Sequence, residues 1–253
     1  MTILDISEAN GAIDWSAVRG HIDGAILRAG YRGYGSAGRL VADARWKANA
    51  AGCAAAGIPF GAYWVSQAID ETEAVNEAQF LDRLLQGKKI SLPVFLDSEW
   101  GEAQSGSGRA DRISPAQRTQ NALAFLRALR DRGYETGLYT GLSWFREQLS
   151  GEAIRADGHF IWLASVEHVE PSIPYDGWQY TWQGRVPGVR TAVDLSRFRE
   201  AAAVNDTGSA WSAEARAWAI RSGIFRGDGS GDYRWREPVT REELAAVLQR
   251  ALG

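Results

Sequence analysis

Along the first 141 residues, two patterns of apolar and polar positions follow each other in turn. Short apolar runs bounded by turn residues predict strands, and longer stretches with an apolar face at helical spacing predict helices. The predicted strands are residues 4–7, 25–30, 60–66, 93–99 and 135–141, and the predicted helical segments are 13–19, 43–56, 70–86 and 114–132. Three more strands, at 160–165, 177–182 and 192–195, follow with little helix between them. This order favours an α/β fold, an irregular parallel β/α barrel (TIM-like).

Several residues mark the ends of these elements. Ser114 followed by Pro115 is typical of a helix N-cap with proline at the first helical position. Gly57, with Pro59 just beyond it, ends the Ala-rich helix. Residues 101–113 are polar and rich in glycine and serine, so we expect a flexible lip after the fourth strand.

Composition and charge exclude several classes of partner. The chain has 253 residues, of which 45 % are hydrophobic and 23 % charged, as in an ordinary soluble globular protein. A formal net charge of -3 gives no reason to expect nucleic acid or an anionic membrane, and no apolar run approaches a membrane span. The first residues show no signal peptide. We therefore expect synthesis in the cytoplasm and release by other means, unless the sequence lacks its signal.

The cysteine, histidine and tryptophan residues bear on three kinds of feature: disulfides, metal or triad sites, and sugar-stacking surfaces. The single cysteine, Cys53, excludes an internal disulfide and fits a small core residue. The three histidines, His21, His159 and His168, show no metal-ligand spacing, so we expect no metal, no cofactor and no Ser-His-Asp triad. The 11 tryptophans suit stacking against sugar rings, although core packing uses tryptophan too.

Two carboxylates end the fourth predicted strand. Asp97 and Glu99 are two positions apart, so their side chains share one face of the strand. Burial and mutual repulsion raise the pKa of such a pair, and a proton held near neutral pH is what general acid catalysis at a glycosidic oxygen requires. Taken alone, the pattern is better explained by an acid pair that ends a strand and faces water.

Two further acids occupy comparable positions. Asp5 lies in the first predicted strand and Asp194 in the last. In a closed barrel the reactive groups lie at the carboxyl ends of the strands, so we expect Asp5, Asp97, Glu99 and Asp194 to surround one mouth. Four acids from three strands favour a catalytic site over solvated surface.

The chain resembles glycoside hydrolase family 25, the Chalaropsis-type lysozymes or N-acetylmuramidases, over roughly residues 3–198. The matching pieces stand in the family's order: Asp5-Ile-Ser7, Ile13-Asp-Trp15, Leu27-Arg-Ala-Gly30, Gly61-Ala-Tyr63, Leu96-Asp-Ser-Glu99, Gly137-Leu-Tyr139, Trp162-Leu-Ala164, Trp178-Gln-Tyr180 and Val193-Asp-Leu195. One position departs from the family: Trp64 stands where histidine often follows the tyrosine of the third strand.

The resemblance implies hydrolysis of the β-1,4 bond between N-acetylmuramic acid and N-acetylglucosamine in peptidoglycan. It implies that Glu99 is the general acid/base, that Asp97 is its partner at the reacting centre, and that Asp5 and Asp194 orient groups and tune the pKa of the pair. Five other residues are implied to line the cleft, although each also fits core packing or the surface: Arg28, Tyr63, Tyr139, Trp162 and Tyr180.

The sequence does not decide whether hydrolysis retains or inverts the configuration of the anomeric carbon. Retaining enzymes hold their carboxyl groups about 5–5.5 Å apart and inverting enzymes about 6.5–9.5 Å, and a same-face pair fits either range. A third route, in which the acetamido group of the substrate is the nucleophile, is the one we favour.

Chitinase family 18 is a neighbouring possibility, because it is also a barrel with acids at the end of the fourth strand. Its motif has two further aspartates, at positions where this chain has Phe95 and Leu92, so the match is weak.

The last 50 residues differ in character from the barrel. We expect a catalytic barrel at residues 1–204, a linker at 205–210 and a helical module at 211–253. The module resembles a single S-layer homology motif, through Trp218-Ala-Ile220, Gly223-Ile224, Arg226-Gly-Asp-Gly229 and Thr240-Arg-Glu-Glu243-Leu244. An EF-hand reading of the loop after Gly227 fails, because Tyr233 and Val239 stand where Gly and Glu are needed.

The motif resemblance implies binding to a secondary cell-wall polymer, docking on the barrel or assembly into a homo-oligomer. A hairpin that merely covers the barrel is the simpler alternative. The whole sequence therefore predicts a peptidoglycan hydrolase that acts on the bacterial cell wall. Two alternatives remain at this point: a binding protein that grips wall glycan without cutting it, and a hydrolase of another amino-sugar polymer such as chitin.

Overall fold

The computed structural model describes residues 1–101, 108–165, 169–199, 212–225, 235 and 239–252. The chain forms two compact units, Met1–Arg199 and Glu200–Gly253. Residues 102–107 of the expected lip, all of the expected linker and the motif residues 226–229 lie outside the described residues. Within the described residues no helix is both long and apolar enough to cross a membrane.

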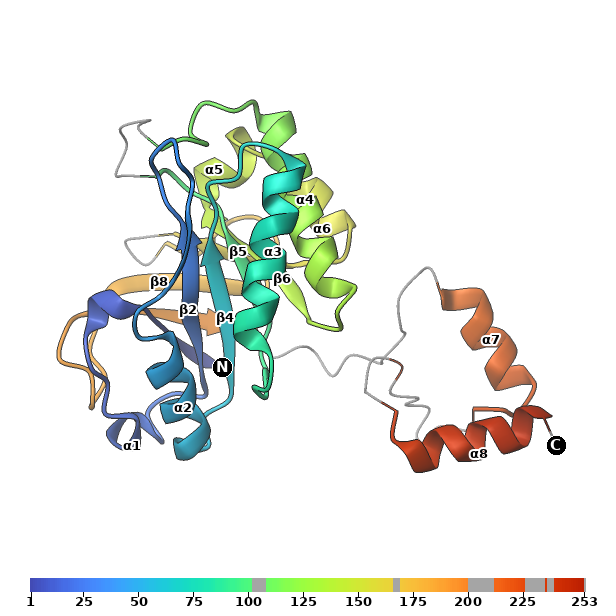
Figure 1. Cartoon of the computed structure of the whole chain (residues 1–253). Coiled ribbons are helices and arrows are strands. Elements are labelled where there is room, and N and C mark those ends of the chain that lie inside the picture. The colour runs from blue at the N-terminus through green and yellow to red at the C-terminus, as the bar shows by residue number, and fades with distance from the viewer. Residues whose placement is uncertain (102–107, 166–168, 200–211, 226–234, 236–238, 253) are drawn as a thin grey trace. The chain divides into compact units, whose positions relative to one another are not determined.

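The first unit is a closed barrel of eight strands with a ninth at its rim (Figure 1). Around the ring the order is β1-β2-β4-β5-β6-β7-β8-β9, and β9 pairs with β1 to close it. Neighbours are parallel from β1 to β8, whereas β9 is antiparallel to both of its neighbours. The strands are β1 (Thr2–Ile6), β2 (Gly24–Arg32), β3 (Leu40–Ala42), β4 (Phe60–Val65), β5 (Val94–Asp97), β6 (Thr136–Gly141), β7 (Phe160–Ala164), β8 (Gly177–Gly184) and β9 (Val193–Phe198). The predicted α/β barrel is confirmed.

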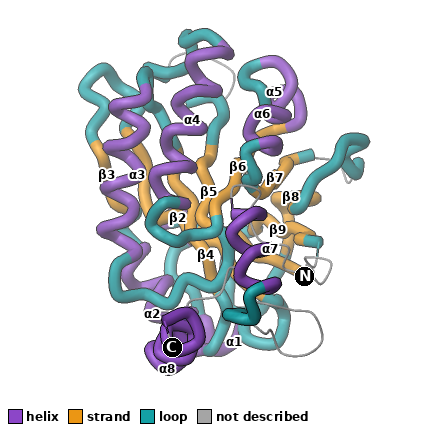
Figure 2. The backbone as a smooth tube through the Cα atoms, turned by 90° about the vertical axis from the view of Figure 1, so that its right-hand side faces the viewer, coloured by secondary structure: helices purple, strands orange, loops and turns teal. Residues whose placement is uncertain are grey.

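Helices cover the outside of the parallel strands. In Figures 1 and 2, α3 and α4 lie side by side along the outer face of the strands, and the two helices are in contact. The helices of this unit are η1 (Glu8–Asn10), α1 (Trp15–Val18), α2 (Trp46–Ala56), α3 (Glu71–Leu85), α4 (Pro115–Arg130), α5 (Leu142–Glu147) and α6 (Gly151–Ala156). Ser114 caps α4 through its hydroxyl, which accepts from Gln117 N, and Pro115 follows, as predicted.

Successive side chains of each strand point to opposite faces of the barrel wall, so the apolar residues form two clusters. Side chains on the outer face, such as Leu4, Leu27 and Leu96, pack beneath the helices, whereas those on the inner face fill the barrel. The inner cluster is largely aromatic, and Phe95 lies at its centre with ring centroids 5.0–5.8 Å from its neighbours. Its fully or nearly buried members are Ile3, Ile26, Phe95, Trp162 and Phe198. This aromatic floor closes the barrel below the mouth.

Three features depart from the predicted elements. The short strand β3 and the six-residue helices α5 and α6 are absent from the prediction, because such short elements show little periodicity. β9 is antiparallel because only residues 185–192 connect it to β8, too few for a parallel crossover. Asp194 is therefore at the amino end of its strand, and the expected carboxyl-end position is wrong. It still reaches the mouth, because an antiparallel strand begins where its parallel neighbours end.

In the part of the second unit that the structure describes there are two helices, α7 (Ala213–Arg221) and α8 (Arg241–Leu252). Thr240 and Glu243 form the predicted capping box, since each accepts a hydrogen bond from the backbone N–H of the other. Gly223 follows α7 with φ 70°, a conformation that favours glycine. The division of the chain at residue 204 stays a prediction.

Candidate active site

Asp5 and Asp194 meet at the mouth of the barrel. They are direct partners across the antiparallel β1–β9 pair. Asp5 is only 8 % exposed and accepts a hydrogen bond from Gln179 Nε2 at 3.1 Å. The amide oxygen of Gln179 in turn accepts from the Tyr139 hydroxyl at 2.9 Å. Side chains of β1, β6, β8 and β9 thus converge at one place inside the rim.

Asp97 and Glu99 enter the mouth from β5. Asp97 is the last residue of the strand and is 4 % exposed, whereas Glu99 follows two positions later and is exposed. Neighbouring strands fix the backbone here: Ser66 N donates to Asp97 O at 3.0 Å, and Ser98 N donates to Tyr139 O at 3.1 Å. One carboxylate is therefore enclosed and the other reaches solvent.

The Asp97 carboxylate is incompletely satisfied. Its Oδ1 atom is buried and accepts no hydrogen bond from any described residue. A buried acceptor without a donor is destabilising. This atom is therefore ready to accept a hydrogen bond from a bound molecule.

All four acids titrate above their ordinary range, and burial is the largest cause for each. The pKa of Asp5 rises well above its usual value through burial and the charge of Asp194. The pKa of Asp97 rises well above its usual value through burial and the charges of Glu99 and Asp5. The surrounding residues partly desolvate the Glu99 carboxyl, although its side chain is exposed, and with the charge of Asp194 they raise its pKa.

Among the described residues, Arg28 is the cation whose charge acts on Asp97. Arg28 on β2 donates to Asp43 Oδ2 at 2.8 Å and to Glu8 Oε1 at 3.0 Å. Its positive charge lowers the pKa of Asp97 against the dominant effect of burial. Arg28 therefore lies close enough to the acids to influence them, but its guanidinium is held by two other carboxylates.

Two tyrosines border the same acids. The pKa of Tyr63 on β4 rises well above its usual value through burial and then the charge of Asp5. The pKa of Tyr139 on β6 rises similarly through burial and then the charge of Glu99. Both phenols thus stay protonated and able to donate hydrogen bonds at the mouth.

Acids of unequal exposure and raised pKa at the mouth of a β/α barrel are what a glycoside hydrolase requires. The family model described as "Glycosyl hydrolases family 25" matches residues 4–189. The chain belongs to glycosyl hydrolase family 25.

Proteins named as lysozymes and as an autolysin are similar to this family 25 chain. It is 25% identical over 207 residues to an autolytic lysozyme of Clostridium acetobutylicum, covering 81% of this chain and 57% of that protein. It resembles the modular autolysin LytC of Streptococcus pneumoniae, solved with a synthetic peptidoglycan ligand, at TM-score 0.66 and 28% identity, covering 77% of this chain and 46% of LytC. It also resembles a Streptomyces coelicolor lysozyme at TM-score 0.65 and 25% identity, covering 80% and 94%. The chain thus spans about half the length of the first two relatives.

The last two predicted cleft residues of the family 25 barrel, Trp162 and Tyr180, pack against other side chains. Trp162 is 2 % exposed, donates to Ser196 Oγ at 3.0 Å and lies against the Tyr139 ring at 4.5 Å, within the aromatic floor. Tyr180 packs against the outer apolar cluster and lies near Arg197. Their contact with sugar stays a prediction.

Gln179 is a site residue that the sequence reading missed. It stands between Trp178 and Tyr180, and strand alternation turns it to the opposite face from Trp178, toward Asp5. The alternation of polar Gln179 with two aromatic residues is a signal that could have found it.

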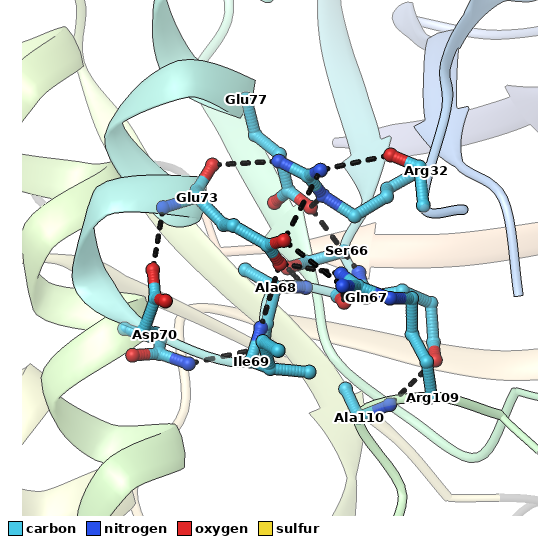
Figure 3. Close-up of polar contacts among 12 residues, drawn as sticks. Arg32, Ser66, Gln67, Ala68, Ile69, Asp70, Glu73, Glu77, Arg109 and Ala110 are labelled. Atoms are coloured by element: carbon cyan, nitrogen blue, oxygen red, sulfur yellow. Dashed lines mark hydrogen bonds and ion pairs between the residues drawn. The ribbon is translucent and has the colours of Figure 1, made fainter. Parts of the chain in front are cut away.

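A polar network supports the backbone beside the acid pair. Figure 3 shows Arg32 reaching from β2 to Glu73 and Glu77 on α3. Arg109 donates to both carboxylate oxygens of Glu73, and Gln67 Oε1 accepts from Ala110 N at 3.1 Å. The network therefore joins β2, α3, the β4–α3 turn and the chain beyond Glu99.

Asp111 extends this support to the residues after Glu99. Its carboxylate oxygens accept from Gly101 N at 3.0 Å and from Gly108 N at 2.8 Å. The backbone is thus held two residues beyond Glu99 as well as at Asp97.

Proposed function

We propose that this family 25 chain is a peptidoglycan hydrolase, a β-1,4-N-acetylmuramidase that cleaves between N-acetylmuramic acid and N-acetylglucosamine. The main support is the solvent-reaching Glu99, with its raised pKa, beside the enclosed Asp97. The wall lytic activities named for its relatives agree with this substrate.

Glu99 is the general acid and then the general base in this proposal. Burial and the Asp194 charge raise its pKa, so a larger fraction of Glu99 is protonated near neutral pH. Its exposure lets the carboxyl reach a glycosidic oxygen of a bound strand. Asp5 and Asp194 maintain the negative potential that keeps the proton on Glu99.

Asp97 acts on the acetamido group of the substrate. In the substrate-assisted route, Glu99 protonates the leaving oxygen while the acetamido carbonyl oxygen of the muramic acid attacks the anomeric carbon. Asp97 Oδ1, which is buried without a donor, accepts the acetamido N–H and stabilises the cyclic cation. Water then adds to the anomeric carbon, gives its proton to Glu99 and opens the ring with retained configuration. Appearance of the inverted anomer first, by NMR, would exclude this route.

The residues predicted to line the cleft divide by position. Arg28 acts electrostatically on Asp97, and Tyr63 and Tyr139 interact with several of the acids. All three are proposed to hold hydroxyl and acetamido groups. Trp162 supports Tyr139 from below in this proposal. Tyr180 remains a candidate for contact further along the strand.

The test compares purified cell walls incubated with wild type, Glu99→Gln and the matched surface control Glu152→Gln. We expect new reducing ends from wild type and Glu152→Gln, and at least a 100-fold slower release from Glu99→Gln. Mass spectrometry identifies the sugar with the free end, and a parallel chitin digest tests the other amino-sugar polymer. Wild type that binds walls without releasing reducing ends would support a binding protein instead.

For the second unit we propose wall attachment or self-assembly at the bacterial cell wall. Its two helices leave large apolar side chains exposed, including Trp218, Leu244 and Leu248. A unit this small buries little apolar surface alone. Light scattering of the full chain, with Leu244→Ser and Leu248→Ser together as comparison, tests assembly, and co-sedimentation with walls stripped of secondary polymer tests attachment.

A further inference from the structure

Trp100 occupies an unusual position directly after Glu99. Its side chain is 40 % exposed, whereas the backbone on either side is anchored at Asp97 and at Gly101. Single exposed apolar residues are ordinary on protein surfaces. Trp100 differs because it combines exposure, anchoring and adjacency to the proposed acid.

The Trp100 ring is braced from below. It stands edge-on against Trp144, with ring centroids 4.6 Å apart and an interplanar angle of 83°. Trp144 is buried, and its indole N–H donates to Ser98 Oγ at 3.2 Å. The edge-to-face geometry is the favourable one for an aromatic pair, and it leaves part of the Trp100 ring uncovered.

Trp144 is itself held by Arg118. The Arg118 guanidinium lies 4.7 Å from the centre of its ring, within the range of a cation–π interaction. Arg118 is buried and donates to the backbone carbonyls of Ala110 at 2.7 Å, Asp111 at 3.2 Å and Gln148 at 3.2 Å. The stack Trp100–Trp144–Arg118 is therefore preorganised, so a ligand would find the ring already in place.

We propose that Trp100 is a sugar-stacking residue, and that it contacts a pyranose ring of the glycan at or next to the cleaved bond. Neighbouring Cα atoms are about 3.8 Å apart, so the backbone of Trp100 lies at the mouth of the barrel, beside that of Glu99. The C–H faces of pyranose rings are apolar and match a flat aromatic surface, whereas the hydroxyl groups at their edges stay in water. This inference rests on the proposed function and adds a substrate contact to it.

The kinetic test uses soluble, uncrosslinked glycan strands and four proteins: wild type, Trp100→Ala, Trp100→Phe and Glu152→Gln. Glu152 is an exposed residue of α6 and serves as the surface control. We expect Trp100→Ala to raise KM about tenfold with kcat changed less than about threefold, from the loss of one aromatic contact. Trp100→Phe should stay within about threefold of wild type, and Glu152→Gln should be unchanged.

Wild type that releases no reducing ends would refute the proposed function. Active wild type with the same KM in Trp100→Ala, or an equal loss in Trp100→Phe, would refute stacking. A second measurement does not depend on the alanine variant folding. The Trp100 indole N–H resonance, assigned by its absence in Trp100→Phe, should shift when glycan strands are added to 15N-labelled Glu99→Gln, and an unmoved resonance under conditions where other signals shift would overturn the inference.

Discussion

Asp5 and Asp194 face each other as direct partners across the antiparallel pair β1–β9, and the Gln179 amide donates a hydrogen bond to Asp5. Like charges so close raise the pKa of Asp5, after the larger effect of burial, and the Asp194 charge also reaches Glu99. Asp5 and Asp194 therefore add negative potential at the mouth of the barrel, from two strands that do not carry Asp97 and Glu99.

Replacing Asp194 with Asn should shift the pH profile of activity. Removing its charge lowers the pKa of Glu99, so the alkaline limb of kcat/KM moves to lower pH and activity at pH 7 falls about tenfold. The measurement is reducing-end release between pH 4 and 9, with the exposed Asp131→Asn as control. An unshifted limb in Asp194→Asn would show that Asp194 does not tune the acid.

Asp97→Asn should stabilise the fold and abolish most of the activity. A carboxyl whose pKa is raised in the folded state lowers stability as pH rises above its ordinary pKa, because ionisation then favours the unfolded chain. The amide has no charge to bury, so we expect a gain of about 1–3 kcal/mol at pH 7 and a loss of activity of about 100-fold or more. Denaturant unfolding at pH 5 and pH 8 measures the first effect. A variant less stable than wild type at both pH values contradicts it.

Glu77→Gln should remove part of the pH dependence of stability. Burial raises the pKa of Glu77 from 4.5 to about 7, against the lowering effects of Ser66 and Arg32. The folded state therefore holds this proton while the unfolded chain has released it, and stability falls between pH 4.5 and pH 7 by up to about 3 kcal/mol. Glutamine cannot titrate, so the stability of Glu77→Gln should fall less over that interval. Urea unfolding at several pH values measures the difference, and the exposed Glu71→Gln on the same helix should behave as wild type.

Gly137→Ala should disturb the aromatic floor beneath Asp97. A Cβ at Gly137 would lie 2.5 Å from the Phe95 ring and 2.8 Å from the carbonyl oxygen of Phe160. We expect destabilisation of about 1–3 kcal/mol and reduced activity, because Phe95 is two residues before Asp97 on the same face. Gly141→Ala on the same strand is the control, since no atom lies within 4 Å of its Cβ. Equal stability of the two variants in urea would show that the floor tolerates the methyl group.

Local patterns in the sequence determined the strands and longer helices of the barrel and the positions of the acids. The alternation Phe95–Asp97 on β5 repeats as Ile3–Asp5 on β1, so each strand by itself specifies an apolar inner residue followed by an acid. The N-cap Ser114 and the capping box of α8 depend only on neighbours three residues away, and such signals are readable without a fold.

Only the tertiary structure decided which side chains meet. The antiparallel direction of β9 sets Asp194 opposite Asp5 from 189 positions away, and no local spacing encodes that register. The β-bulge that follows Gln179 and the contact of Trp100 with Trp144 on α5 likewise join residues from separate parts of the chain. Periodicity states which face a side chain takes, whereas burial, charge proximity and therefore the raised pKa of the acids arise from contacts between distant segments.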